Sequence, residues 1–179
     1  MEPLGERQLS ALVRAPWQLQ RLSLSGKELG DEDAAALAAA AWPSLQQLIL
    51  DGNSLGPTGA ASLATAAWPL LRVLVLDGTS LGDAGAASLA AARWHFLRRL
   101  CLGNNNLGEA GAASLAAARW PSLQELAMHG NSLGDAGAVA LAAAHFPALQ
   151  GLFLDANGIS SEGGALLQAR WPTARTSVS

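Results

Sequence analysis

The sequence predicts an α/β fold: a right-handed solenoid in a horseshoe arc, with a parallel β-sheet on the concave face and α-helices on the convex face. Two observations predict this fold. The chain repeats every 25–26 residues, and each repeat holds a strand-like pattern followed by a helix-like one. Aromatic residues mark the period, at Trp17, Trp42, Trp68, Trp94, Trp120, Phe146 and Trp171. Because no unit of this length buries its apolar side alone, the units must stack.

Each unit opens with leucines in the spacing L-x-x-L-x-L-x-x-N-x-L. In the second unit the pattern falls on Leu45, Leu48, Leu50, Asn53 and Leu55. The paired leucines alternate with period two, as in a half-buried strand, and the asparagine amide is suited to hydrogen-bond the backbone of a turn. Lys27 and Thr79 replace this asparagine, so we expect their turns to be held less tightly.

An alanine-rich segment such as Asp83–Arg93 follows each turn and predicts a helix. Acidic residues at the helix starts and Arg93, Arg119 and Arg170 at the ends favour the helix dipole. We expect one inward-facing leucine per helix, five residues before the aromatic marker: Leu37, Leu63, Leu89, Leu115, Leu141 and Leu166. The aromatic markers themselves are expected to form a buried ladder.

The period divides the chain into an N-terminal half-repeat or cap (1–16), six repeats (17–41, 42–67, 68–93, 94–119, 120–145 and 146–170) and a truncated seventh repeat or tail (171–179). Residues 5–16 predict a helix that covers the first strand. In the tail, Ala174 stands where a strand leucine belongs. The last strand is therefore expected to present an open edge, which invites end-to-end pairing with another copy unless the chain is part of a longer protein.

This pattern resembles the leucine-rich repeats of the ribonuclease-inhibitor-like class over about residues 5–171. The helix signature G-A-x-x-L-A, as at Gly85-Ala86 and Leu89-Ala90, is similar to the GALA-type repeats of some F-box effectors. Similar units occur in the sensor regions of NOD-like receptors and in Ran GTPase-activating proteins. The resemblance implies a protein-binding scaffold and names no partner, since a fold does not fix a function.

Composition narrows the class of partner and the compartment. The net charge is −3 and the pI about 5.5, which argues against nucleic acid as the partner, because that affinity comes from clustered Lys and Arg. Cys101 is the only cysteine, so no intrachain disulfide forms and a reducing compartment is expected. Apolar runs end well before the ~18 residues of a membrane span. We expect a cytoplasmic protein, with a nuclear location as the alternative.

The residues between the strand leucines are expected to face outward on the concave side. They form an apolar row bordered by charged rows, which is the usual anatomy of a binding surface. The alternative is that β-branched residues simply favour strands. The predicted partner-binding residues are Ile49, Asp51, Val73, Val75, Asp77, Arg99, Cys101, Glu125, His129, Phe153 and Asp155.

Sites of catalysis or of metal binding are not predicted. Cys101, His129 and Asp155 stand in the order nucleophile, base and orienter, but the diagonal from Cys101 to His129 is ~7–8 Å and no loop builds a pocket over them. The histidines occupy three different repeat positions and cannot converge on zinc. The glycines recur with the period, which indicates repeat turns rather than a phosphate loop. We therefore predict no enzyme, cofactor or metal.

The sequence thus favours a non-catalytic module that binds a protein on its concave sheet. One alternative is an enzyme regulator of the Ran GTPase-activating-protein type, whose arginine lies on a loop, whereas Arg72, Arg98 and Arg99 all occupy strand positions here. The other alternative is a structural spacer within a larger receptor or assembly.

Overall fold

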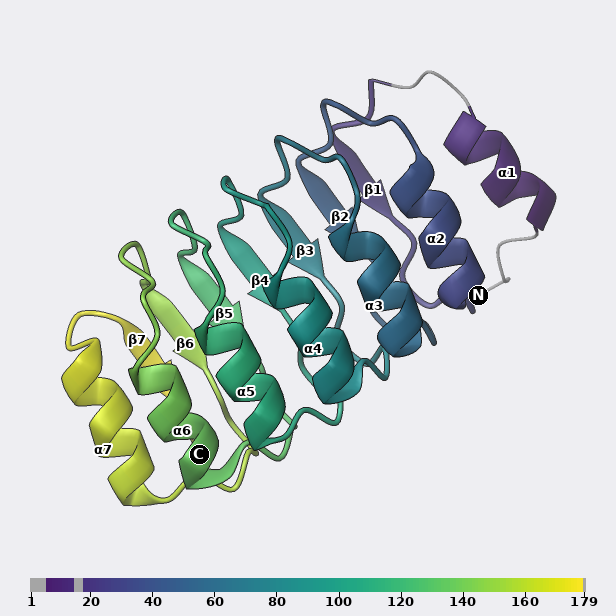
Figure 1. Cartoon of the computed structure of the whole chain (residues 1–179). Helices are drawn as coiled ribbons and strands as arrows, with labels where there is room; N and C mark the ends of the chain where they lie inside the picture. The colour runs from purple at the N-terminus through teal and green to yellow at the C-terminus, as the bar shows by residue number, and fades with distance from the viewer. Residues whose placement is uncertain (1–5, 15–17, 179) are drawn as a thin grey trace.

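The computed structural model describes residues 6–14 and 18–178, which form one stack of alternating helices and strands (Figure 1). The helices are α1 (Glu6–Arg14), α2 (Asp31–Ala39), α3 (Gly56–Ala64), α4 (Gly82–Ala90), α5 (Glu109–Ala116), α6 (Gly134–Ala142) and α7 (Ser161–Arg170). The strands are β1 (Arg21–Ser23), β2 (Gln47–Ile49), β3 (Val73–Val75), β4 (Arg99–Cys101), β5 (Glu125–Ala127), β6 (Gly151–Phe153) and β7 (Arg175–Ser177). Within these ranges, no helix is long and apolar enough to cross a membrane.

The strands form one sheet in the order β1-β2-β3-β4-β5-β6-β7, and every neighbouring pair is parallel. The helices line one face of this sheet and leave the other face open (Figure 1). The predicted α/β solenoid is confirmed, while its horseshoe curvature stays a prediction. The tail that follows Trp171 adds β7, which pairs with β6. The C-terminal edge of the described sheet is therefore β7.

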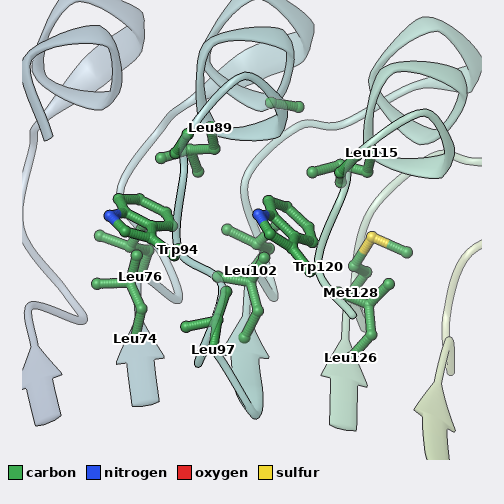
Figure 2. Packing of buried hydrophobic residues seen from close by; sticks show 14 of the residues in the cluster. Leu74, Leu76, Leu89, Trp94, Leu97, Leu102, Leu115, Trp120, Leu126 and Met128 are labelled. Atoms are coloured by element: carbon green, nitrogen blue, oxygen red, sulfur yellow. The ribbon is translucent and has the colours of Figure 1, made fainter. Parts of the chain in front are cut away.

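The core lies between the sheet and the helices. The aromatic ladder predicted there is confirmed from Trp42 onward, since all its members from that residue to Trp171 are buried; Trp17 falls outside the described residues. Trp94 and Trp120 each lie between strand leucines and a helix leucine, Leu89 or Leu115 (Figure 2). The rings of Trp120 and Phe146 stack, with centroids 6.4 Å apart.

The inward leucine of α7 is Leu167, and the prediction of Leu166 is wrong. Leu167 is fully buried, whereas Leu166 is 41% exposed. The sixth repeat is one residue shorter than the fifth, and the missing residue falls between the inward leucine, Leu167, and Trp171. Counting back from the aromatic marker therefore shifts the position by one. Counting forward from the turn asparagine, Asn157, selects Leu167.

The helices also end earlier than predicted. α4 ends at Ala90 and α5 at Ala116, so Arg93 and Arg119 lie beyond the last turns and only Arg170 lies within one. The reason is local: the N–H of Ala92 bonds to the carbonyl of Leu89, three residues back. Such a tightened turn ends the helix and directs the chain back to the next strand.

The turn asparagines form hydrogen bonds with the preceding repeat as well as within their own turn, although only the bonds within the turn were predicted. The Asn53 Oδ1 atom accepts hydrogen bonds from the backbone N–H groups of Lys27 (2.9 Å) and Leu29 (3.0 Å) in the preceding repeat. Its Nδ2 atom donates to the carbonyls of Leu24 (2.9 Å) and Leu50 (2.6 Å). Asn105, Asn131 and Asn157 are likewise buried and bonded.

Thr79 replaces the turn asparagine in the third repeat. The side chain is fully buried, and its hydroxyl donates to the Leu76 carbonyl at 2.7 Å. Its side chain makes fewer hydrogen bonds than the Asn53 side chain does, in line with the expectation of a less tightly held turn. Its remaining side-chain contact, 3.1 Å to the Asn105 Oδ1 atom, is with the following repeat. The turn asparagines also accept hydrogen bonds from backbone N–H groups of the preceding repeat, which we call the backward bridge. Among the described residues, Thr79 makes no such bond.

Candidate partner-binding face of the sheet

The side of the sheet away from the helices, which we call the open sheet face, carries three rows of residues in register. The first row is Arg21, Gln47, Val73, Arg99, Glu125, Gly151 and Arg175. The middle row is Ser23, Ile49, Val75, Cys101, Ala127, Phe153 and Ser177. The third row follows the strands and comprises Ser25, Asp51, Asp77, Gly103, His129 and Asp155.

The middle row is apolar from β2 to β6. Ile49, Val75 and Cys101 are register partners on adjacent strands, and Ala127 and Phe153 continue the row. All five are half-buried, whereas the leucines that alternate with them face the core. Val73 lies beside this row on β3 and is also half-buried. A continuous strip of apolar side chains therefore remains partly exposed along the open sheet face.

The first row carries the ionic border on one side of this strip. Arg99 and Glu125 are register partners, and their side chains form an ion pair of 2.5 Å. Because both side chains are well exposed, the pair adds little to stability. The two charges offset one another, so this border is close to neutral at β4 and β5.

Phe153 is the last residue of the apolar strip, and contacts with neighbouring residues position its ring. Its ring lies over Gly151, where a Cβ atom would come within 3.0 Å of the Phe153 Cε2 atom. The guanidinium carbon of Arg175 lies 5.9 Å from the ring centroid, within the range of a cation–π contact. Arg175 was not among the predicted site residues, because the tail carries no strand leucine that would have identified β7.

The third row brings Asp77 and His129 together over Gly103. The Gly103 N–H donates to the Asp77 Oδ1 atom at 2.5 Å. A Cβ atom at Gly103 would overlap the His129 imidazole and lie 2.8 Å from Asp77 Oδ1. Burial raises the pKa of the Asp77 carboxyl above its usual value, and the nearby Asp51 charge adds to this, against the Gly103 hydrogen bond and the His129 charge.

The other two carboxylates of the third row have hydroxyl partners. The Ser25 hydroxyl donates to the Asp51 Oδ1 atom at 2.6 Å. The Ser177 hydroxyl donates to Asp155 from β7. The third row is therefore an anionic border, and its carboxylates are positioned by neighbouring repeats.

The arrangement does not support catalysis by Cys101, His129 and Asp155. The His129 ring lies over Gly103 beside Asp77, and Asp155 bonds to Ser177. Burial, with Asp77 as the next cause, raises the pKa of the Cys101 thiol to about 11. A nucleophilic cysteine needs a lowered pKa. In the part of the chain that the structure describes, no three His, Cys, Asp or Glu side chains gather to hold a metal ion.

Comparison with family models finds a leucine-rich repeat in two parts of the chain, residues 43–64 and 121–142. Each match covers a strand and the whole of the helix that follows it. The matches fall in the second and fifth repeats of the predicted division and confirm the repeat type. Comparison with curated proteins gave no match.

Proposed function

We propose that the chain, which matches the leucine-rich-repeat model in residues 43–64 and 121–142, is a non-catalytic module that binds a protein partner on its open sheet face. The observation that carries this proposal is the apolar strip from Ile49 to Phe153, which the solenoid leaves half-exposed between two polar borders. Large exposed apolar strips rimmed by polar groups mark contact surfaces in soluble proteins.

The dimensions of the face favour a protein over a small ligand. Strands lie about 4.8 Å apart, so the sheet from β1 to β7 extends over roughly 30 Å. That length matches one side of a standard protein–protein interface. A small molecule instead needs a concave pocket that encloses most of its surface.

The charges of the two borders indicate the polarity of the partner. The third row presents Asp51, Asp77 and Asp155, whereas the first row carries Arg21, Arg99 and Arg175 against a single acidic residue, Glu125. We propose that the partner places apolar side chains on the strip and basic groups against the third row. Such complementary charge mainly sets orientation and association rate.

The test compares two folded double variants in an affinity capture read by mass spectrometry. Val75→Arg with Phe153→Asp places charges on the apolar strip. Phe96→Asp with Val139→Arg makes equivalent changes at exposed apolar residues elsewhere, which are 54% and 59% exposed. Partners retained by the second variant and lost from the first would support binding on the open sheet face.

Equal partner sets for both variants would contradict the proposal and favour a structural spacer. Circular dichroism and the unfolding midpoint verify that each variant is folded. A GTP-hydrolysis assay with the captured partner addresses the enzyme-regulator alternative. Acceleration that depends on Arg72 or Arg98 would replace the proposal of a non-catalytic module.

A further inference from the structure

Three hollows follow one another along the edge where α3 to α6 end and the chain returns to the sheet. Their volumes are about 590, 500 and 530 Å³. The first and second share Ala91 and Arg93 as lining residues, and the second and third share Ala117 and Arg119. Together they form one continuous depression, which we call the edge groove.

The edge groove exists because short side chains follow each helix. Alanines occupy the last helical turn and the residues after it, as at Ala91 and Ala117, and both are exposed. Tryptophan and proline of the helix-to-strand turn, such as Trp120 and Pro121, line the groove beside them. The same small residues recur in successive repeats, so the groove runs across repeats rather than ending in one.

The charged side chains that line the edge groove among the described residues are arginines, and two histidines lie beside them. Arg93, Arg119, His95 and His145 line it, and no Asp or Glu does. In the last repeat, Arg170 is used structurally, since it donates to the carbonyls of Ala142 and Ala144 at 3.1 Å each.

Arg93 and Arg119 have no such use. In residues 6–14 and 18–178, neither makes an ion pair or a side-chain hydrogen bond. Both line the middle hollow, Arg93 from the end of the third repeat and Arg119 from the end of the fourth. Two unpaired guanidinium groups therefore flank an apolar depression.

The acidic residues lie mainly at the opposite edge, where the strands end and the helices begin. Asp83, Glu109 and Asp135 lie in first helical turns, and Asp51, Asp77 and Asp155 follow strands. The edge groove is thus locally positive in a chain whose net charge is −3. Charge complementarity therefore favours an anionic occupant.

We propose that the edge groove binds an extended acidic peptide segment of a partner protein. Arginine holds carboxylates through two parallel hydrogen bonds, which lysine or histidine cannot match. Packed helices lie ~8–10 Å apart. An extended chain in the polyproline II conformation advances ~3.1 Å per residue with three residues per turn. Carboxylates three residues apart therefore lie on one face, ~9 Å apart, and meet Arg93 and Arg119 in turn, while small aliphatic residues between them lie on the alanine floor.

The probe is a fluorescein-labelled peptide of about twelve residues that repeats Glu-Val-Ala, read by fluorescence anisotropy with the full chain. Saturable binding is expected, weakening at higher salt. Arg93→Gln with Arg119→Gln should weaken it about tenfold. Ala117→Trp, which fills the groove without removing charge, should weaken it comparably. Arg72→Gln with Arg98→Gln removes the same charge outside the lining and should leave affinity within about twofold.

Several outcomes would overturn the proposal. One is the absence of saturable binding, and another is an equal loss in the Arg72 and Arg98 control. Undiminished binding to the Ala117→Trp variant would place the peptide elsewhere. A fourth outcome is a salt-sensitive dimer in sedimentation velocity that is lost with Arg93 and Arg119, without peptide binding. It would identify the acidic edge of a second copy as the occupant instead.

Discussion

The carboxylate of Asp83, in the first turn of α4, accepts a hydrogen bond from the backbone N–H of Gly108, which precedes α5, at 2.7 Å. The same Oδ1 atom accepts from the Gly111 N–H at 2.9 Å. Gly108 has no side chain to cap α5, so the preceding repeat supplies the cap. Gly111 must lack a Cβ atom, which would lie 2.5 Å from the Asp83 oxygen.

Replacing Asp83→Ala is expected to lower the free energy of unfolding by about 1–2 kcal/mol, the usual cost of a lost N-cap. Two N–H groups at the start of α5 lose their acceptor. Urea unfolding followed by circular dichroism measures the change. Asp31→Ala is the matched control, because Asp31 has the same repeat position in α2 and its carboxylate makes no hydrogen bond to the described residues. Equal losses in both variants would contradict an inter-repeat cap.

Replacing Thr79→Asn is expected to raise the free energy of unfolding by about 1 kcal/mol. Asn105 accepts from the N–H groups of Thr79 (3.0 Å) and Leu81 (3.3 Å) in the preceding repeat. An asparagine at position 79 gains the equivalent bonds to the N–H groups of Asn53 and Leu55. Thermal or urea unfolding reports the gain.

The reverse substitution tests the same physical reason. Asn105→Thr removes a backward bridge and is expected to lower stability by about 1–3 kcal/mol, because buried backbone groups lose their partner. A Thr79→Asn variant that is less stable than the wild type would show that the extra bonds do not form. The turn would then be optimised around the hydroxyl of Thr79.

The 26-residue period predicted the sheet register, because every unit meets its neighbour at equivalent positions. Ile49 and Val75 are partners in the structure as the period requires. The period does not locate a deletion inside a unit, and for that reason Leu166 was selected in place of Leu167. β7 escaped prediction because Arg175–Ser177 carries none of the leucines that mark a strand.

The side-chain contacts on the open sheet face were less predictable, because they depend on glycines, which leave space for neighbouring side chains. Asp77 and His129 lie two repeats apart and approach only because Gly103, between them, has no Cβ atom. The ring of Phe153 likewise lies over Gly151. A one-dimensional pattern shows which residues share a row, but not which neighbour a side chain turns toward when a glycine leaves space.

Replacing Asp77→Asn is expected to raise stability at neutral pH, by an amount that decreases as the pH falls. The pKa of Asp77 is raised above 3.8, mainly by burial, so the folded protein binds this proton more tightly than the unfolded chain does. Ionisation of Asp77 therefore disfavours folding as the pH rises through its raised pKa. Asparagine keeps an acceptor for the Gly103 N–H and does not ionise.

The measurement is the difference in unfolding midpoint between the two proteins at several pH values from 3 to 7. Each comparison isolates position 77, since the other groups titrate in both proteins. The difference should grow with pH. A difference that grows toward low pH would mean that the Gly103 and His129 contacts outweigh burial.

The Cys101 thiol is expected to alkylate slowly. Its pKa is about 11, against 9.0 for an unperturbed thiol, because burial and then the Asp77 charge disfavour the thiolate. At pH 8 the thiolate fraction is about one-hundredth of that of a free thiol. The rate with iodoacetamide, followed by mass spectrometry, should rise about tenfold per pH unit from 7 to 10. A plateau below pH 9 would contradict the raised pKa.

Replacing Ala156→Gly is expected to stabilise the protein by about 0.5–1 kcal/mol. Ala156 has a φ of 55°, and the equivalent residue is glycine with positive φ at Gly26, Gly52, Gly78 and Gly130. The left-handed conformation costs an L-residue about 1 kcal/mol, and relief of that strain exceeds the extra backbone entropy of glycine. Ala87→Gly makes the same change at an exposed helical position of α4. It should destabilise by about 0.5–1 kcal/mol. A gain in the free energy of unfolding at position 156 with a loss at position 87 would isolate the backbone conformation as the cause. A loss of stability at both sites would show that the Ala156 side chain makes a contact that outweighs its backbone strain.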